Sequence, residues 1–313
     1  MFNSMEYIYE VYKERSFSKA AANLYISQPS LSATVKKTEA KIGAPIFDRS
    51  VNPIQLTECG EVYIKSIEEI MDIQNRFENY VNDLNDLKTG QLAIGGSNLF
   101  ASYVLPPLIT QFTKKYPLVR IRLIEANTPQ LINQLFHGAL DLVIDNSTFP
   151  DALYQRHFYT TETLLLAVPK NFESNNAARK YSLNLAEIAA GKHLEDSAPS
   201  VPLHLFGKDP FIYLRSGNDT RSRAEKICQS QNFTPNIILK LDQQATAFNL
   251  CSYGMGNTFV SDTILKSIKT DSSCCFYKVE GTNTHRSIYL YHKQNKYVTR
   301  AMQEFLKIAS AEE

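Results

Sequence analysis

Residues 16–37 read SFSKAAANLYISQPSLSATVKK, and this stretch decides the fold of the N-terminal part of the chain. The pattern predicts two short helices joined by a tight turn. Ser18 is expected to cap the first helix and Ser27 the second, and Pro29 falls in a first turn, where its missing N–H costs nothing. Such a helix-turn-helix places the N-terminal end of its second helix in the DNA major groove. The alternative is an ordinary helical hairpin buried in a core.

The flanking sequence extends this unit to residues 1–57. Gly43 is placed to end the second helix of the motif. Two extended pieces around Asn52-Pro53 predict a small hairpin within residues 45–57, the wing of a winged helix. An opening helix is expected from apolar side chains at helical spacing, namely Met5, Ile8, Val11 and Tyr12.

Residues 58–88 form a long segment without proline, which predicts one linker helix. Sustained heptads on such a helix favour pairing with a second copy, and Gln74 is the kind of polar residue that fixes register. Two recognition helices on a two-fold axis then match half-sites roughly 34 Å apart. The alternative is a helix packed on its own domain. Three heptad rows make up the stripe: Ile67, Gln74 and Val81; Ile70, Phe77 and Leu84; Ile73, Tyr80 and Leu87.

The remaining chain alternates strand-like and helix-like segments, which predicts βαβ units around buried parallel sheets. A first unit is expected to have strands at 91–96, 120–125 and 141–145 and helices at 100–116 and 129–137. A second unit is expected to have strands at 163–168, 211–214 and 237–241, a helix ending in a short strand at 254–260, and loops at 171–179 and 195–208. A strand at 287–291 and a helix at 299–309 are expected to return to the first unit.

The composition of the chain limits the classes of protein to which it can belong. With 313 residues, two or three packed units are expected, and 43% hydrophobic with 21% charged residues excludes a disordered chain. A net charge of +1 argues against a general nucleic-acid coat but allows a local basic face. Neither a bilayer-crossing run nor a signal-peptide pattern is seen, so we expect a cytoplasmic protein without membrane contact.

The chemistry-bearing residues give little support to an enzyme. The six histidines have no metal-ligand spacing, and residues 254–259 do not fit the dinucleotide glycine pattern. No cofactor or metal is expected. The five cysteines are scattered, so reduced thiols near cores are expected. The alternative is a redox-sensing pair such as Cys228 and Cys251.

Several motifs with matching spacing resemble the LysR-type transcriptional regulators: residues 16–21, 27–32, Glu39, Gly43, 47–49 and 56–60. The resemblance implies an α/β fold with an N-terminal all-α winged helix-turn-helix, a long linker helix and two Rossmann-like (periplasmic-binding-protein-like) α/β subdomains. It divides the chain into a DNA-binding domain (1–57), a linker and dimerisation helix (58–88) and an effector-binding domain (89–313). In that last domain, subdomain I takes 89–162 and 267–313, and subdomain II takes 163–266.

The resemblance also implies a function. It points to a sequence-specific DNA-binding transcriptional regulator, controlled by a small-molecule effector in the cleft between the subdomains. Double-stranded promoter or operator DNA, the effector and RNA polymerase are the implied partners, and a homodimer or homotetramer is the implied assembly. Two alternatives are a thiol-based redox-sensing regulator of the same architecture and, in a different class, a solute-binding protein without DNA function.

The DNA-facing positions carry over one at a time. Gln28 and Pro29 stand where family members touch base edges and thymine methyls, and a glutamine can bond adenine in bidentate fashion. Arg49 and the wing are expected near phosphate or the minor groove. Ala33 and Asn52 replace arginines found in many members, which predicts fewer guanine contacts and an operator read partly by shape. The DNA-binding candidates are Ser18, Ser27, Gln28, Pro29, Ser30, Ser32, Lys36, Arg49 and Asn52.

The effector candidates follow predicted strands, because ligands of α/β units bind beyond the C-terminal ends of strands. Ser97 and Asn98 precede a helix and could hold an anion or simply cap that helix. Asn146 is neutral where some aromatic-acid sensors have arginine, so either the effector is less acidic or a positive charge comes from elsewhere. The effector-binding candidates are Ser97, Asn98, Thr128, Asn146, Leu203, Gly217, Asn218 and Thr246.

Overall fold

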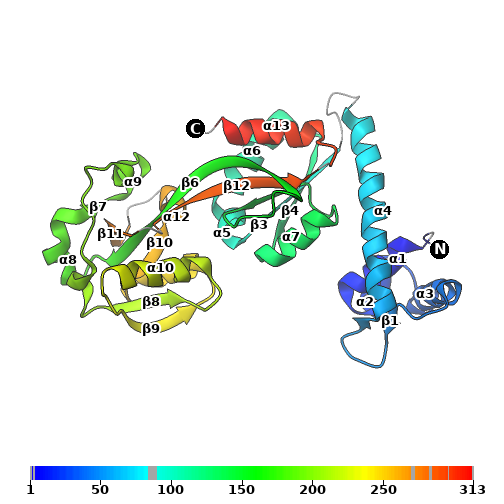
Figure 1. Ribbon diagram of the computed structural model, residues 1–313. Coiled ribbons are helices and arrows are strands. Elements are labelled where there is room, and N and C mark those ends of the chain that lie inside the picture. The colour runs from blue at the N-terminus through cyan, green and yellow to red at the C-terminus, as the bar shows by residue number, and fades with distance from the viewer. Residues whose placement is uncertain are drawn as a thin grey trace.

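The computed structural model describes residues 2, 4–83, 90–268, 272–281, 284–294 and 296–311. An N-terminal head is followed by the long helix α4, which leads to a two-part body (Figure 1). The head consists of α1 (Met5–Glu14), α2 (Phe17–Asn23), α3 (Gln28–Ile42) and the hairpin of β1 (Phe47–Asp48) and β2 (Gln55–Leu56). The winged helix-turn-helix expected from the sequence is therefore present.

Local capping defines the two helices of the motif. The Ser27 side chain accepts the Ser30 N–H at the start of α3, and Gly43 ends α3 with φ +83°, both as expected. The expected cap at Ser18 is wrong, because Ser16 caps α2 by accepting the Lys19 N–H. Helix α2 starts at Phe17, whose ring is buried in the head, so Ser18 lies inside the helix with an exposed side chain.

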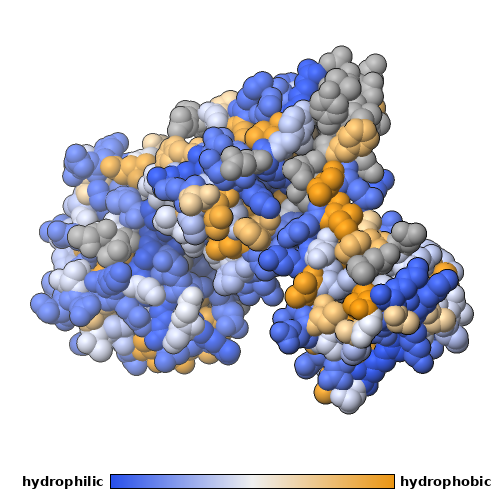
Figure 2. All heavy atoms as spheres, turned by 45° about the vertical axis from the view of Figure 1, so that its right-hand side comes forward, coloured by the Kyte–Doolittle hydropathy of each residue, from blue (hydrophilic) through white to orange (hydrophobic). Residues whose placement is uncertain are grey.

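Helix α4 (Glu58–Asp83) belongs to the head at its start and projects from it further on. Ile64 and Ile67 are buried in the same cluster as Ile8 of α1 and Leu31 of α3. Beyond them the helix carries exposed apolar side chains, which appear as hydrophobic surface on the helix between head and body (Figure 2). Of the predicted heptad rows, Leu84, Leu87 and the side chains of Tyr80 and Val81 lie outside the described residues.

The first body subdomain has the expected βαβ order. Its strands pair in parallel in the order β4-β3-β5, and the bounds expected for the first two are confirmed. The single helix expected at 100–116 is broken at Val104, because the following Pro106 and Pro107 cannot donate backbone hydrogen bonds within a continuous helix. The elements are β3 (Gln91–Gly96), α5 (Asn98–Tyr103), α6 (Leu105–Lys115), β4 (Arg120–Glu125), α7 (Thr128–Phe136) and β5 (Leu142–Asp145).

Two long antiparallel strands join the subdomains (Figure 1). β6 (Tyr154–Pro169) pairs with β12 (His285–Lys293) along its first part and with β10 and β11 along its second. β6 begins well before the strand expected at 163–168, because its first part has no continuous apolar run.

The second subdomain differs from the prediction in three places. Gly254 lies in a turn with φ +87° before β10, so no helix occupies the start of 254–260. Both expected loops contain short helices. β11 pairs with β6 and β7, so the boundary at residue 267 is too early. The elements are α8 (Ser174–Ala178), η1 (Arg179–Tyr181), β7 (Ser182–Leu183), α9 (Leu185–Ala189), η2 (Lys192–Leu194), η3 (Leu203–Phe206), β8 (Pro210–Leu214), α10 (Asp219–Ser230), β9 (Asn236–Leu241), α11 (Gln244–Ser252), β10 (Thr258–Ser261), α12 (Asp262–Lys266) and β11 (Cys274–Lys278).

The last helix, α13 (Arg300–Ser310), packs on the first subdomain as expected, with Met302 and Phe305 buried in its core. Among the helices that the structure describes, none combines the length and the apolar character that a membrane span requires.

Candidate functional site

The first turn of α3 faces solvent. Gln28, Pro29 and Ser30 are exposed, whereas Leu31 and Val35 further along the helix are buried in the head core. The alternative of a hairpin sunk in a core is therefore wrong for this helix. An amphipathic helix held by one face presents its N-terminal side chains as a fixed, accessible edge, which is the geometry of groove-reading helices.

Arg49 is exposed, but its guanidinium is paired with other residues of the head. Its Nη2 lies 3.0 Å from Glu39 Oε2, its Nη1 donates to Ser32 Oγ at 3.3 Å, and its guanidinium lies 4.7 Å from the centre of the Phe17 ring. The other Glu39 oxygen accepts the backbone N–H of Ile46 at 2.9 Å. Glu39 and Arg49 thus fasten the wing to α3, and the expected place of Arg49 near phosphate or the minor groove stays a prediction. Lys36 and Asn52 are exposed as well.

A cavity of about 610 Å³ lies between the two subdomains. The ends of β3, β4 and β5 open into it from one side, and the first turns of α10 and α11 from the other. Six predicted residues line it: Ser97, Asn98, Thr128, Asn146, Gly217 and Asn218.

Two predicted effector residues do not line the cavity. Leu203 is completely buried in the apolar core of the second subdomain, so that prediction is wrong. Thr246 is exposed on α11, where Gln244 and Ala245 line the cavity in its place. One residue of difference along a helix turns the side chain by about 100°, which suffices to exclude Thr246.

Much of the hydrogen-bonding capacity on the first-subdomain side is already used. Thr128 Oγ1 donates to Asp145 Oδ2 at 2.9 Å, and the Ser147 N–H donates to Asp145 Oδ1 at 2.7 Å. Asn98 Nδ2 donates to Glu125 Oε1 at 3.0 Å. The Thr128 oxygen lone pairs and the Asn98 Oδ1 therefore stand as acceptors beside the cavity.

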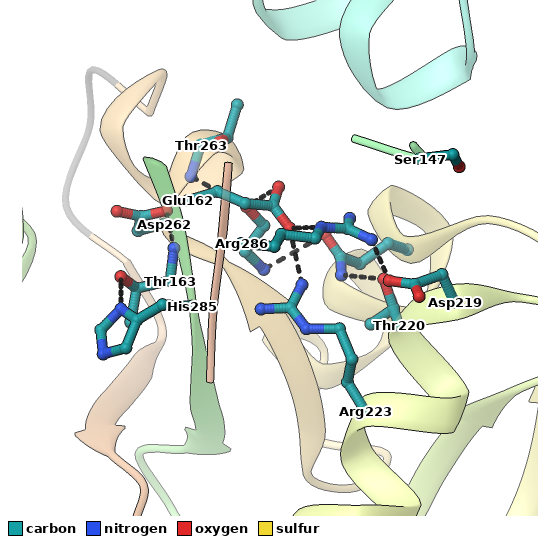
Figure 3. A network of polar contacts seen from close by, with 12 residues as sticks. Ser147, Glu162, Thr163, Asp219, Thr220, Arg223, Asp262, Thr263, His285 and Arg286 are labelled. Atoms are coloured by element: carbon teal, nitrogen blue, oxygen red, sulfur yellow. Dashed lines mark hydrogen bonds and ion pairs between the residues drawn. The ribbon is translucent and has the colours of Figure 1, made fainter. Parts of the chain in front are cut away.

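A charged network closes the cavity near the crossing strands (Figure 3). Arg286 of β12 lines the cavity and pairs with both Glu162 of β6 and Asp219 of α10. Glu162 also accepts from Arg223 Nη1 at 2.7 Å and from Ser261 Oγ at 2.9 Å. Burial and the neighbouring Arg286 charge lower the pKa of Arg223, and Glu162 opposes that shift.

Sequence reasoning missed Arg286, Glu162 and Asp219. Their ion pairs join residues more than sixty positions apart, so no local spacing could reveal them. One feature of the sequence could have indicated Glu162 and Arg286: each is a charged residue within an otherwise strand-like segment. Arg286 brings a positive charge to the cavity, but Glu162 and Asp219 already pair with it.

A second polar group lies beside this network. Thr163 of β6 donates its backbone N–H to Asp262 Oδ1 at 2.8 Å, and Asp262 Oδ2 lies 3.0 Å from His193 Nε2. Burial tends to raise the pKa of Asp262, but hydrogen bonds and charge from His193 and Lys266 overcome it and lower the pKa. No group of three or more metal-ligating side chains is found in the described part of the chain.

The cysteines lie in or near cores as expected, with Cys228, Cys251 and Cys274 buried. The alternative, a pair of Cys228 with Cys251, does not fit their contacts. Cys228 Sγ contacts the Tyr213 hydroxyl at 3.1 Å, whereas Cys251 Sγ lies 3.6 Å from Cys274 Sγ.

The chain is similar to known proteins in both sequence and structure. A sequence profile described as "Bacterial regulatory helix-turn-helix protein, lysR family" matches residues 2–61, and one described as "LysR substrate binding domain" matches residues 85–312. The "Uncharacterized HTH-type transcriptional regulator YcgK" of Bacillus subtilis is 30% identical over 308 residues, covering 97% of this chain and 92% of the relative. A "Probable RuBisCO transcriptional regulator" of Nostoc sp. is 27% identical over 296 residues, covering 93% and 82% respectively.

Solved structures share the fold over the whole chain. The "Crystal structure of full-length CbnR complexed with the target DNA complex" superposes with a TM-score of 0.66 at 17% identity and covers 100% of both chains. A full-length OxyR variant from Pseudomonas aeruginosa superposes with a TM-score of 0.67 at 19% identity, covering 99% of this chain and 97% of that one.

Proposed function

The chain belongs to the LysR family of bacterial helix-turn-helix regulators, and we propose on that basis which residues read DNA, which bind the effector and how the two sites are coupled. It is a LysR-type DNA-binding transcriptional regulator and not an enzyme. We expect the regulator to act in the cytoplasm, where promoter DNA and RNA polymerase meet.

The exposed first turn of α3 is the observation that carries the DNA-reading proposal. Gln28 reads a base edge with its amide, a contact worth about 1–3 kcal/mol of discrimination when it is bidentate to adenine. Pro29 lies against a thymine methyl, while Ser30, Lys36 and Asn52 contact the backbone or the adjacent groove. With Ala33 and Asn52 in place of arginines, the operator is A·T-rich and read partly through its shape.

The cavity between the subdomains holds the effector. Its volume of about 610 Å³ suits a small metabolite. Thr128, Asn98 and Asn146 offer neutral polar groups, and Arg286 is already paired with two carboxylates. A small polar molecule that is not a strong anion is therefore the proposed effector.

The exposed apolar face of α4 supports a homodimer. Val62, Ile73 and Phe77 are 65%, 56% and 68% exposed. A second copy of the helix would cover these side chains, and pairing the two heads would present two recognition helices to DNA. Two such dimers would form a tetramer.

Coupling between the sites runs through α7. Thr128 begins this helix at the cavity, and His137 follows its last turn, 3.8 Å from Glu68 on α4. Tyr9 of the head donates to Glu68 at 3.4 Å. Effector binding shifts the equilibrium between positions of α7 and hence between positions of the heads on DNA.

A gel-shift experiment tests DNA reading. The full chain is titrated against the DNA upstream of its own coding sequence and against a scrambled duplex at several salt concentrations. Gln28→Ala should reduce the affinity ratio between the two duplexes about tenfold, with little change in binding to the scrambled one. Gln229→Ala, which alters an exposed glutamine of the second subdomain, is the matched control. Equal binding of both duplexes by the unaltered protein would contradict the proposal.

A further inference from the structure

Two cysteines that neither DNA reading nor the effector cleft uses lie in contact in the second subdomain. Cys251 is in the last turn of α11, and Cys274 is the first residue of β11. Their sulfur atoms are 3.6 Å apart, and both side chains are buried, at 0% and 3% exposure. We propose that Cys251 and Cys274 form a reversible disulfide when the protein meets a peroxide.

The geometry brings the two sulfurs close to bonding distance. A disulfide places its sulfurs about 2.0 Å apart, so an approach of roughly 1.5 Å closes the bond. Both cysteines belong to an apolar cluster that includes Phe248 and Phe276. A buried cysteine is ordinarily a small apolar side chain. A second thiol at contact distance sets this pair apart from Cys228, whose neighbour is a tyrosine hydroxyl.

The two thiols differ in reactivity. Ser252 Oγ lies 3.7 Å from Cys274 Sγ, and the Cys274 N–H donates to Ser272 Oγ at 3.1 Å. The hydrogen bond from Cys251 lowers the pKa of Cys274, whereas that same contact and burial raise the pKa of Cys251. Cys274 is therefore the thiol that meets the oxidant first, because the thiolate is the nucleophile.

The residues next to the two cysteines reach the surface at this end of the subdomain. Ser273 is exposed next to Cys274, and Ser252 is half-buried next to Cys251. Hydrogen peroxide is little larger than water, so a small local opening beside these serines would admit it.

The reaction balances with hydrogen peroxide as the only oxidant. The Cys274 thiolate attacks a peroxide oxygen, so that an S–O bond forms, the O–O bond breaks and the leaving hydroxide takes up the thiol proton as water. Cys251 then attacks the sulfenic sulfur; an S–S bond forms, the S–O bond breaks, and the Cys251 proton leaves with the hydroxide as a second water. Two thiols and one peroxide give one disulfide and two waters. A dithiol reductant reverses the change by exchange.

The crosslink would fix one wall of the cleft. It would tie the C-terminal end of α11 to β11, while Gln244 and Ala245 at the other end of α11 line the cavity. The bond would also close a loop of the unfolded chain, which raises stability. Formation of this disulfide depends on neither DNA binding nor effector binding, so it can be tested without DNA or effector.

The test is a thiol map of the reduced full-length protein. The protein is treated with a fivefold excess of hydrogen peroxide, denatured in N-ethylmaleimide and digested. We expect the number of alkylated thiols to fall from five to three, with a peptide containing Cys251 joined to one containing Cys274. Dithiothreitol before alkylation should restore all five. The oxidised protein should also melt at a higher temperature than the reduced protein.

Single variants identify the sulfurs. Cys251→Ala and Cys274→Ala should each abolish the joined peptide, whereas the matched controls Cys228→Ala and Cys275→Ala should retain it. The map of the unaltered protein decides the question even if a variant folds poorly. The proposal is overturned if no joined peptide forms, or if it persists in Cys274→Ala through the adjacent Cys275.

Discussion

The guanidinium of Arg49 is bound within the head by Glu39, by Ser32 and by the face of the Phe17 ring. From the sequence, an arginine beside a wing is most simply a phosphate ligand. The structure gives it another role, because the turn after α3 brings Glu39 beneath the wing. Arg49 thereby sets the angle between wing and recognition helix.

Arg49→Lys tests that role, since lysine keeps the charge but cannot match the planar fork. The pair is partly exposed, so we expect a loss of only about 1 kcal/mol in the free energy of unfolding. DNA affinity should fall several-fold, while the dependence of affinity on salt stays the same. A lost phosphate contact would instead reduce that slope by about one. Urea unfolding and binding at several salt concentrations measure both, with exposed Arg120→Lys as control.

Glu162 is the carboxylate on which the cleft network depends. It is 1% exposed and faces Arg223 and Arg286. Glu162→Gln would leave two guanidinium groups around a neutral amide, and breaking a buried pair in this way costs about 3–5 kcal/mol. The control is Glu225→Gln, an exposed partner of Arg221, which should cost under about 1 kcal/mol. Equal urea midpoints for the two variants would contradict the predicted role of Glu162.

His157 and His292 give the protein a stability that depends on pH. Their rings stack with centres 5.1 Å apart. Burial lowers the pKa of both, and the charge of His292 adds to the shift at His157. The unfolded chain binds these protons near pH 6.5 and the folded chain does not, so the free energy of unfolding falls as pH drops below about 6.5.

Replacing one of these rings should flatten the profile. His292→Phe keeps a stackable ring and removes one titrating group, so its loss of stability between about pH 7.5 and about pH 5.5 should be smaller than that of the unaltered protein. Exposed His204→Phe is the control. Unfolding in urea at each pH measures the effect, and parallel profiles for all three proteins would contradict it.

The sequence predicts a helix or strand correctly where the local pattern of apolar and polar residues also determines which side chains are buried. The strands at 91–96 and 120–125 were predicted to the residue, since each is a compact run of strand-forming residues beside a turn residue. The first part of β6 was missed, because its residues alternate between exposed and half-buried and pair mainly with β12. Leu203 was misassigned for a related reason: sequence alone cannot tell a short helix that closes a core from a loop that lines a cleft.

The exposed apolar face of α4 is expected to hold two copies of the chain together. Phe77→Glu places a charge on the exposed face, where a partner helix would otherwise bury the ring. We expect the variant to sediment mainly as a monomer at micromolar concentration and to lose most of its operator affinity, with unchanged thermal stability of the body. Tyr253→Glu alters a 90% exposed aromatic residue elsewhere and should sediment like the unaltered protein. A Phe77→Glu dimer of unchanged affinity would exclude pairing through this face.

The cleft is formed by residues from both subdomains. The sequence predicts the residues on the first-subdomain side better than those on the opposite side. Ser97, Thr128 and Asn146 could be placed because they follow parallel strands, whose C-terminal ends open onto one edge. Arg286 and Asp219 could not, because the crossing of β6 and β12 and the docking of α10 bring them there. Topology, and not any local pattern, assembles that side of the cavity.

The contact between Glu68 and His137 joins head, linker helix and body, and it leads to a prediction for the overall shape. Burial raises the pKa of Glu68, although the His137 charge and the Tyr9 hydroxyl oppose the shift. The folded state therefore disfavours ionised Glu68. Protonation of Glu68 as pH falls relieves this free-energy cost and removes the carboxylate charge that faces His137.

Glu68→Gln keeps an acceptor for Tyr9 but removes the charge that faces His137. We expect a larger radius of gyration by small-angle scattering at neutral pH, because the head is no longer tied to α7, and an unfolding midpoint that is equal or higher. As pH falls, the scattering of the unaltered protein should approach that of the variant, since the raised pKa of Glu68 brings its protonation at a higher pH than for an ordinary glutamate. Glu69→Gln, an exposed neighbour on the same helix, should scatter like the unaltered protein throughout. If Glu68→Gln and Glu69→Gln scattered alike at every pH, α7 would have no hold on the head through this contact, and coupling would have to pass through the linker alone.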